Sequence, residues 1–212
     1  VFLSSRSRIT QEPETLSTSR LERLLSRGKF VVTCEVSTPR GCNTETFLSR
    51  VNSVRECCVA VNVTDNLRAM PAMDSLAAAH IVLEAGVEPV LQISGRDRNR
   101  VALQSILYGA WALGIRNVLF ITGDYPSCPT CPHAHAVFDF DSISGLRIAR
   151  TIMGGFDLAG NELDGVPRFL LGSTFNPYGE PLELHVRRTE MKHEAGARFF
   201  QTQAVFDASR LE

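Results

Sequence analysis

The stretch Asn117–Pro126, NVLFITGDYP, decides the fold class. Its apolar run, Val118–Ile121, breaks at Thr122-Gly123-Asp124 and then enters a proline-rich loop. A short apolar run without alternation is typical of a buried parallel strand, and the polar residues behind it mark the end that faces solvent. We therefore predict a parallel strand whose carboxyl end carries functional side chains.

Five other stretches repeat this pattern of an apolar run that ends in polar residues. They are Phe30–Glu35, Val59–Asp65, Val90–Ser94, Phe169–Asn176 and Phe199–Gln203. Apart from one longer interval, successive runs lie about 30 residues apart, which is the length of a strand, a helix and two short loops. The sequence predicts an α/β fold of the (β/α)8 TIM-barrel type, with about six βα units in this chain and one face that collects the polar strand ends.

Segments with apolar residues at helical spacing separate the predicted strands. They are residues 19–26, 44–57, 74–85, 100–113 and 141–153, and about 16 residues from Pro181. The first of these helices is expected to plug the bottom of the barrel. Gly154–Pro167 is expected to form a turn-rich connection on the face opposite the site. Residues 1–19 are predicted to be a flexible arm, and residues 20–212 the barrel domain.

Composition limits the possible functions. A chain of 212 residues, 44% of them hydrophobic, can bury one sizeable core. The net charge of -1 argues against a nucleic-acid or anionic-membrane partner. No apolar run is long enough for a membrane span, and the first residues lack the apolar core of a secretory signal, so we expect a cytoplasmic protein. Six cysteines are too few for a disulfide framework, and Cys57 and Cys58 are expected to be free thiols.

Both ends of the sequence suggest an incomplete barrel. The first residue is Val1 rather than Met, and only six of the eight expected strands precede Glu212. Six parallel strands without further neighbours would leave two unpaired edges. We therefore expect a fragment, a homo-oligomer or a subunit that another chain completes.

Two carboxylates at predicted strand ends are candidate catalytic groups. Glu35 ends an apolar strand, where partial desolvation would raise its pKa and suit it to donate a proton near neutral pH. A rim carboxylate paired with a nearby arginine is the alternative. Asp124 follows Gly123, which lets the backbone approach a planar ligand closely. Helix capping is a weaker explanation for Asp124, because the next predicted helix begins many residues later.

Other polar residues leave alternatives open. Gln92 and Gln203 are predicted to lie within strands, so a core hydrogen-bond network or a polar ligand must supply their partners. Arg96, Arg98 and Arg100 suit either a phosphate site or a solvated loop. A further set consists of two cysteines and two histidines: Cys128, Cys131, His133 and His135. Their spacing permits a zinc site but fits an ordinary loop better. Neither a Rossmann glycine motif nor a P-loop motif occurs.

The strand ends carry the motifs of a known family. In chain order these are Cys34-Glu35, Val63-Thr64-Asp65, the run from Gln92 to Asn99, Thr122-Gly123-Asp124, Asn176-Pro177, and Lys192 followed by Ala195-Gly196-Ala197 and Thr202-Gln203. With these motifs over about residues 20–207, the chain resembles the methylenetetrahydrofolate reductase family, the flavin-dependent barrel enzymes of one-carbon metabolism and methionine biosynthesis.

The resemblance implies a reaction and a set of roles. FAD would lie across the top of the barrel, take a hydride from NADH or NADPH, and pass it to 5,10-methylenetetrahydrofolate to give 5-methyltetrahydrofolate. Glu35 would protonate the folate nitrogen, Asp124 would contact both the flavin and the pterin, and Gln203 would hydrogen-bond the pterin. The residues implied for the flavin site are Thr64, Gln92, Thr122, Gly123, Asp124, Asn176 and Lys192.

The chain departs from the family pattern at two of these positions. Many members have His where this chain has Gln92, and Arg where it has Thr122, so the flavin environment is expected to differ. The family's last two strands are also missing. Two other functions stay open. One is a non-catalytic barrel subunit that docks to or regulates one-carbon enzymes. The other is a barrel enzyme that acts on a phosphorylated metabolite through the loop Arg96–Arg100.

Overall fold

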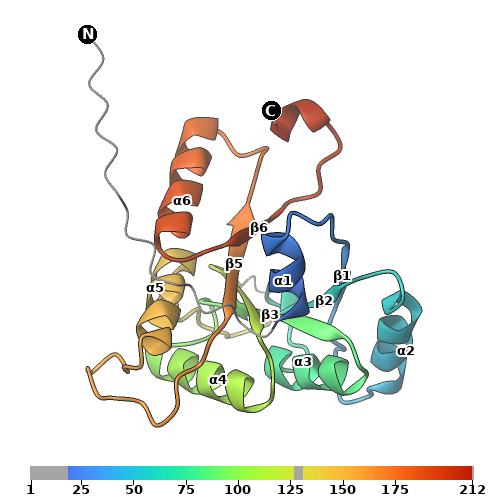
Figure 1. Cartoon of the computed structure of the whole chain (residues 1–212), viewed down its shortest axis with the longest axis horizontal. Coiled ribbons are helices and arrows are strands. Elements are labelled where there is room, and N and C mark those ends of the chain that lie inside the picture. The colour runs from blue at the N-terminus through green and yellow to red at the C-terminus, as the bar shows by residue number, and fades with distance from the viewer. Residues whose placement is uncertain (1–18, 127–130, 212) are drawn as a thin grey trace.

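The computed structural model describes residues 19–126 and 131–211. Six parallel strands form one sheet in chain order (Figure 1). The strands are β1 (Thr33–Val36), β2 (Ala60–Val63), β3 (Glu88–Ser94), β4 (Asn117–Ile121), β5 (Leu170–Phe175) and β6 (Phe199–Thr202). The predicted α/β class and the six parallel strands are confirmed, and within the described residues an α-helix follows each of the first five strands.

The sheet curls into part of a barrel. The Gln201 side-chain amide on β6 donates a hydrogen bond to the Asn62 side-chain oxygen on β2. These strands are not neighbours in the sheet, so their side chains can meet only because the sheet bends around a common interior. The Asn62 amide in turn donates to the Thr33 hydroxyl on β1 at 3.3 Å. The interior above the apolar layer is therefore polar.

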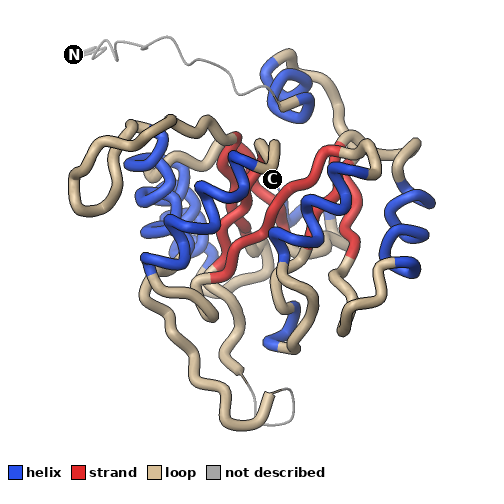
Figure 2. The backbone as a smooth tube through the Cα atoms, turned by 90° about the horizontal axis from the view of Figure 1, so that it is seen from below, coloured by secondary structure: helices blue, strands red, loops and turns tan. Residues whose placement is uncertain are grey.

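Helices cover the outer face of the sheet, as Figure 2 shows. They are α2 (Glu45–Val54), α3 (Ser75–Glu84), α4 (Arg100–Ala112), α5 (Ser142–Met153) and α6 (Leu182–Glu194). Side chains cap three of them at the predicted starts, because Asp74, Asn99 and Asp141 accept hydrogen bonds from backbone N–H groups of the first turn. Short 3-10 turns lie at η1 (Leu67–Ala69) and η2 (Ala208–Leu211).

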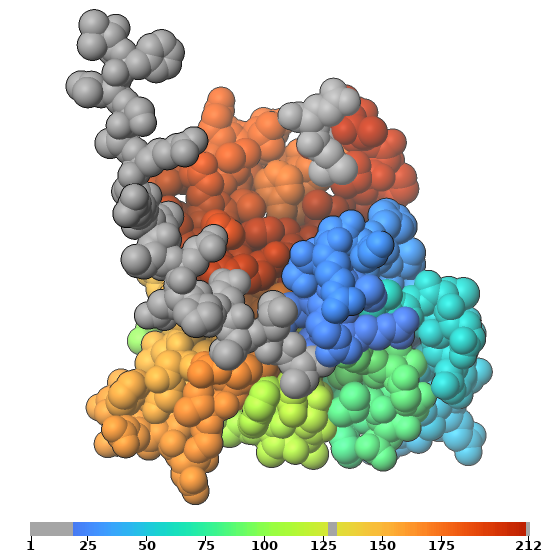
Figure 3. Space-filling view, in the orientation of Figure 1, coloured from blue at the N-terminus to red at the C-terminus, as the bar shows by residue number. Residues whose placement is uncertain are grey.

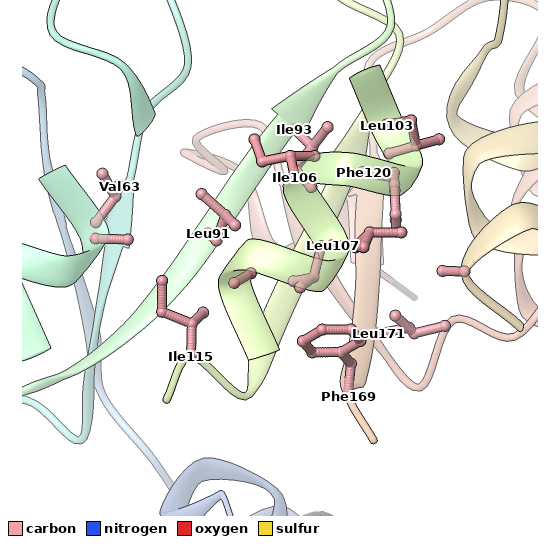
Figure 4. Packing of buried hydrophobic residues seen from close by; sticks show 14 of the residues in the cluster. Val63, Leu91, Ile93, Leu103, Ile106, Leu107, Ile115, Phe120, Phe169 and Leu171 are labelled. Carbon is pink, nitrogen blue, oxygen red and sulfur yellow. The ribbon is translucent and has the colours of Figure 1, made fainter. Parts of the chain in front are cut away.

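Two apolar layers hold the fold together. The larger lies between the sheet and the helices, where strand residues such as Leu91 and Ile93 pack near Leu103 and Leu107 of α4 (Figure 4). Fully burying such a side chain contributes about 1.5–3 kcal/mol. The smaller layer fills the barrel interior near the amino ends of the strands. Its buried members are Leu21, Ala60, Val90, Leu119 and Leu170.

The first helix, α1 (Arg20–Ser26), plugs the bottom of the barrel. Leu21 is 2% exposed and packs into the interior layer. The Ser19 hydroxyl donates to Asn117 at the start of β4, and the Glu88 carboxylate accepts from the backbone N–H of Leu21 at 3.0 Å. Figure 3 shows α1, in blue, on this face of the molecule. The predicted plug is confirmed.

We expect Leu21→Ala to destabilise the chain by about 2–4 kcal/mol, because removal of a fully buried leucine leaves a cavity at the bottom of the barrel. Urea denaturation followed by circular dichroism measures the loss. Leu184→Ala is the matched control, since Leu184 on α6 is 52% exposed. Equal losses in the two variants would contradict the role of α1 as a plug.

The sheet ends at β1 and β6, which pair on one side only within the described residues. The predicted strand Phe30–Glu35 begins later than expected, at Thr33, and Phe30 is almost fully exposed. The turn-rich connection between Gly154 and Pro167 lies at the opposite end of the strands from the loop between β4 and α5, as predicted (Figure 2).

Residues 1–18 of the predicted arm lie outside the described residues, whereas Ser19 is buried as the cap of α1. No helix among the described residues is long and apolar enough to cross a membrane.

Candidate functional site

The carboxyl ends of the six strands surround a pocket of about 490 Å³. Each strand, or the loop directly after it, contributes to the lining. All nine site residues that the sequence singled out line this pocket: Glu35, Thr64, Gln92, Thr122, Gly123, Asp124, Asn176, Lys192 and Gln203. The volume is within the range of small-molecule and cofactor sites. The fold thus brings the predicted residues together in one place.

Glu35 projects from the edge strand β1 into the pocket and is exposed. The expected partial desolvation of this carboxylate is wrong, because no strand pairs with the outer side of β1 among the described residues. The alternative of a rim ion pair is not seen either, since no described arginine or lysine lies within salt-bridge distance of Glu35. Its carboxylate is therefore available to a ligand.

Asp124 lines the same pocket from the loop after β4, and its position depends on Gly123. Gly123 has a φ of +94°, which favours glycine, and a Cβ there would lie 2.3 Å from Ser94 Oγ and 2.9 Å from Arg96 Cβ. Arg96 Nη1 also donates to the Asp124 carbonyl at 3.4 Å. The glycine is required by the protein's own packing, whereas the sequence suggested that it makes room for a ligand.

We expect Gly123→Ala to cost about 1–3 kcal/mol of stability, because the new methyl group meets Ser94 and Arg96 in a left-handed backbone conformation. Gly165→Ala is the matched control: Gly165 has a φ of +96°, but a Cβ there has no heavy atom within 4 Å. Chemical denaturation of both variants separates the clash from the backbone strain. If the Gly165 variant loses as much stability, the packing explanation for Gly123 fails.

The buried amide Gln92 is the strongest sign that the pocket takes a polar ligand. Gln92 is 8% exposed on β3 and lines the pocket. Its side chain makes no hydrogen bond with another described residue. Gln92 is not among the described residues with a buried, unpaired side-chain atom, so its amide is open to the pocket, where a polar ligand can pair with it. Of the two alternatives that the sequence left open for Gln92, the ligand is now favoured over a core network.

Gln203 differs from its predicted position. It follows the last residue of β6 and is exposed, although it still lines the pocket. The inward-facing amide within β6 is Gln201, which bonds to Asn62. Gln201 was not predicted as a site residue, although it lies two residues before Gln203 and therefore on the same face of the extended chain.

Lys192 is a buried cation on α6. It is 9% exposed, and its Nζ donates to the Thr174 carbonyl on β5 at 2.6 Å. Burial lowers the pKa of Lys192, and the nearby Arg188 lowers it further, while Asp141 opposes both. No described carboxylate lies within salt-bridge distance of Nζ. A buried ammonium without a carboxylate partner is suited to an anionic ligand group.

The other residues that α6 presents to the pocket were not found from the sequence. They are His185, Arg188 and Thr189. Together with Lys192 they follow the i, i+3, i+4, i+7 spacing of one helix face. That spacing was the signal available in the sequence.

Thr122 links the pocket to α5. Its hydroxyl accepts a hydrogen bond from the Ser142 backbone N–H at 3.3 Å, and the Ser142 hydroxyl lies at 3.5 Å from it. Ser142 is buried at the first position of α5 and also lines the pocket. The start of α5 is thereby fixed against the carboxyl end of β4.

The arginines of the loop after β3 are paired with carboxylates. Arg96, 2% exposed, donates to Asp97, to the Asn66 carbonyl and to the Asp124 carbonyl. Burial raises the pKa of Asp97, but the hydrogen bonds from Arg96 and Asn66 outweigh this effect and hold the pKa below its usual value.

The same pairing holds along the rest of this loop. Arg98 contacts Asp65 and Asp74, and Arg100 contacts Asp139. The loop Arg96–Arg100 is therefore an ion-pair network, which disfavours both the phosphate site and the solvated loop.

This ion-pair network contacts the turn after β2, whose backbone has left-handed residues. Asn66, Arg68 and Ala69 all have left-handed φ values, between 43° and 57°. Such conformations cost free energy in residues other than glycine and persist only where surrounding contacts enforce them. Asn66 supplies those contacts, since it bonds to Asp97, to Ala72 and to Arg96. The turn places Leu67 and Arg68 in the pocket lining.

The cysteine and histidine residues give no support for a metal site. Cys128 lies outside the described residues, and no group of three potential metal ligands occurs in the part of the chain that is described. Cys57 is an exposed and Cys58 a buried free thiol, as predicted. Burial and the neighbouring Cys34 raise the pKa of Cys58 to about 11, which makes it unreactive at neutral pH.

Comparison with known proteins gives matches in sequence and in structure. A family model described as methylenetetrahydrofolate reductase matches residues 20–212. A probable methylenetetrahydrofolate reductase (NADPH) from Caenorhabditis elegans is 26% identical over 205 residues, which are 91% of this chain and 29% of that protein. The chain thus spans less than a third of the length of this relative.

Two solved structures share the fold. One is an uncharacterized protein from Clostridium thermocellum that binds two copies of 5-methyl-5,6,7,8-tetrahydrofolic acid, with a TM-score of 0.56, 15% identity, and coverage of 90% of this chain and 60% of that one. The other is 2,3-dimethylmalate lyase, with a TM-score of 0.58, 12% identity, and coverage of 90% and 63%. At these identities the likeness concerns the fold alone, and it agrees with a partial (β/α)8 barrel.

Proposed function

The chain belongs to the methylenetetrahydrofolate reductase family, and from this premise we propose that its pocket serves the flavin-dependent reduction of 5,10-methylenetetrahydrofolate to 5-methyltetrahydrofolate by NADH or NADPH. The observation that carries the proposal is the side-chain amide of Gln92, which lines the pocket and makes no hydrogen bond with a described residue. Around it stand two carboxylates that make no ion pair with described residues and one buried ammonium.

The residues present suit FAD. Thr64, Gln92, Thr122, Gly123, Asp124, Asn176 and Lys192 would hold it. When bound, the flavin supplies reversible storage of a hydride. The Gln92 amide can both donate to and accept from the edge of a planar heterocycle, and Lys192 can bind phosphate as a point charge. Arg96 fixes the Asp124 backbone, so this carboxylate stays directed at the pocket.

The two carboxylates have different tasks in this proposal. Glu35 would give a proton to the folate nitrogen that leaves the methylene carbon, which opens the five-membered ring of the substrate. Asp124 would stabilise the positive charge that develops on the substrate, because an anion held against that charge lowers the barrier. Gln203, exposed at the rim, would hydrogen-bond the pterin. Each role needs a side chain that a ligand can reach. All three side chains are exposed and line the pocket.

The comparisons support a folate ligand. The Caenorhabditis elegans relative is named for the reductase and for NADPH, and the Clostridium thermocellum protein binds a methylated tetrahydrofolate. The proposal extends these ligand classes to the present pocket.

Spectroscopy tests the proposal directly. Purified protein reconstituted with FAD should show flavin absorption bands that survive gel filtration, and NADH or NADPH should bleach them without oxygen. Addition of methylenetetrahydrofolate should then restore them. Protein that retains no flavin but binds tetrahydrofolates would instead support a non-catalytic subunit of one-carbon metabolism.

We also propose that further polypeptide, from the same or another chain, closes the gap between β1 and β6. Both edges are unpaired in the described residues, and Glu35 lies on one of them. A chain extended by two βα units should therefore bind FAD more fully than residues 1–212, as measured by the ratio of flavin to protein after dialysis. Equal occupancy in the two chains would contradict the proposal.

A further inference from the structure

A chain of three polar side chains crosses the barrel interior beneath the main pocket. The Gln201 side-chain amide on β6 donates a hydrogen bond to the Asn62 side-chain oxygen on β2, and the Asn62 amide donates to the Thr33 hydroxyl on β1 at 3.3 Å. We call these three residues the Thr33–Asn62–Gln201 relay. None of the roles proposed above uses it, and the sequence analysis singled out none of its members as a site residue.

The middle of the relay is buried and held at both ends. Asn62 is 6% exposed, and both the oxygen and the nitrogen of its side-chain amide are hydrogen-bonded within the relay. Turning this amide over would place its NH2 group against the NH2 group of Gln201, and two donors cannot pair. The orientations of Asn62 and Gln201 are therefore coupled.

The Gln201 end of the relay opens into the main pocket, whose lining includes this residue. Its Nε2 atom is bonded to Asn62, whereas its Oε1 atom has no hydrogen-bond partner among the described residues and is not one of their buried, unpaired atoms. Oε1 is thus an acceptor that a ligand can reach. A purely structural tie between β2 and β6 accounts for the bonded nitrogen but not for the acceptor left open to the pocket.

The relay reaches the pocket beside Glu35. Glu35 and Asn62 are register partners in the parallel pair of β1 and β2, so their side chains leave the same face of the sheet. Thr33 lies two residues before Glu35 on β1 and shares that face. The Gln201 oxygen therefore lies on the side of the pocket where the proposed proton transfer takes place.

We propose that Gln201 contacts the ring system of the substrate and contributes to its specificity, and that Asn62 is a positioning residue that turns Gln201 Oε1 toward the pocket. Oε1 accepts a hydrogen bond from an N–H group of the reduced pterin, on the side that Glu35 protonates. Asn62 acts only through Gln201, since it is not part of the pocket lining. The inference rests on the proposed function for the identity of the substrate.

Calorimetric titration of the FAD-loaded protein with 5-methyltetrahydrofolate tests the contact. Gln201→Met keeps the length of the side chain but removes the amide, so the dissociation constant should rise about tenfold, the effect of one lost hydrogen bond. Flavin content should stay at the wild-type level, because Gln201 is not among the residues assigned to FAD. Gln104→Met is the matched control: the Gln104 amide is also hydrogen-bonded, but it lies on α4 and does not line the main pocket.

A double-mutant cycle tests the positioning role. Asn62→Leu should weaken binding about as much as Gln201→Met, because Gln201 loses the acceptor that orients it. The variant that combines both changes should bind no more weakly than Gln201→Met alone, which a general loss of structure would not produce. Asn62→Asp, which keeps an acceptor for Gln201 Nε2, should restore most of the affinity that Asn62→Leu loses. Additive losses in the combined variant would overturn the relay.

The outcomes separate this contact from the proposed function. If the wild-type protein binds 5-methyltetrahydrofolate and Gln201→Met binds it equally tightly, Gln201 is not a substrate contact, whereas the proposed function stands. If the wild-type protein binds no tetrahydrofolate, the proposed function fails and the role of Gln201 fails with it.

Discussion

Glu35→Gln is expected to leave reduction of bound flavin by NADH or NADPH intact and to slow reduction of methylenetetrahydrofolate by about 10²–10⁴-fold, the usual contribution of a general acid. The amide keeps the size of the side chain but has no acidic proton to give to the folate nitrogen. Stopped-flow absorbance separates the two half-reactions, since each changes the flavin spectrum in the opposite direction.

The exposed position of Glu35 makes this variant easy to interpret. Because Glu35 forms no described ion pair, its replacement leaves no partner charge unsatisfied. Glu84→Gln, at the exposed end of α3, is the control for loss of a surface carboxylate. The proton-donor role is wrong if both half-reactions slow together, or if neither slows.

The architecture was predictable because local pattern and tertiary fold agree. Each apolar run between polar tips became a strand in chain order, and the six predicted helices begin within one residue of the observed starts. The plug helix α1 was also predictable, because a short amphipathic helix before the first strand of a barrel needs an apolar surface to cover.

The environment of each site residue was less predictable than its position. Glu35 ends an apolar run as a desolvated acid would, yet it is exposed, because burial depends on a strand neighbour that the run itself cannot reveal. Gln203 was placed within a strand, but β6 ends at Thr202, so the inward amide that the strand holds is Gln201, two residues earlier on the same face. The pairing of Arg96 with Asp97 and of Arg98 with Asp65 depends on loop geometry, which three arginines in a row do not specify.

Lys192 lowers the stability of the ligand-free chain but suits the pocket to an anion. Burial lowers its pKa, so the folded chain without a ligand holds the charged form at a cost. An anionic ligand group would offset that cost. The fold therefore keeps a cation with which no described carboxylate forms an ion pair, which is what a site built for an anionic cofactor requires.

We expect Lys192→Met to weaken FAD binding by about tenfold to hundredfold, the effect of losing a charge-assisted hydrogen bond. Fluorescence titration of the apoprotein with FAD measures it. Lys29→Met is the control, because Lys29 is exposed and lines none of the pockets at the strand ends. An FAD affinity equal to that of wild type would exclude Lys192 from the cofactor site.

The pH dependence of stability gives an independent check on Lys192 without any ligand. A lysine whose pKa is lowered on folding binds fewer protons in the folded than in the unfolded chain. Its contribution to stability therefore rises as the pH approaches 10.5, the ordinary pKa of lysine. That contribution is lost as the pH falls through the folded-state pKa. The melting temperature of Lys192→Met relative to wild type should therefore be highest near neutral pH and should decline as pH rises toward that value. A difference that stays constant over this range would mean that Lys192 is solvated in the folded chain, and its selection of an anion would then lose its physical basis.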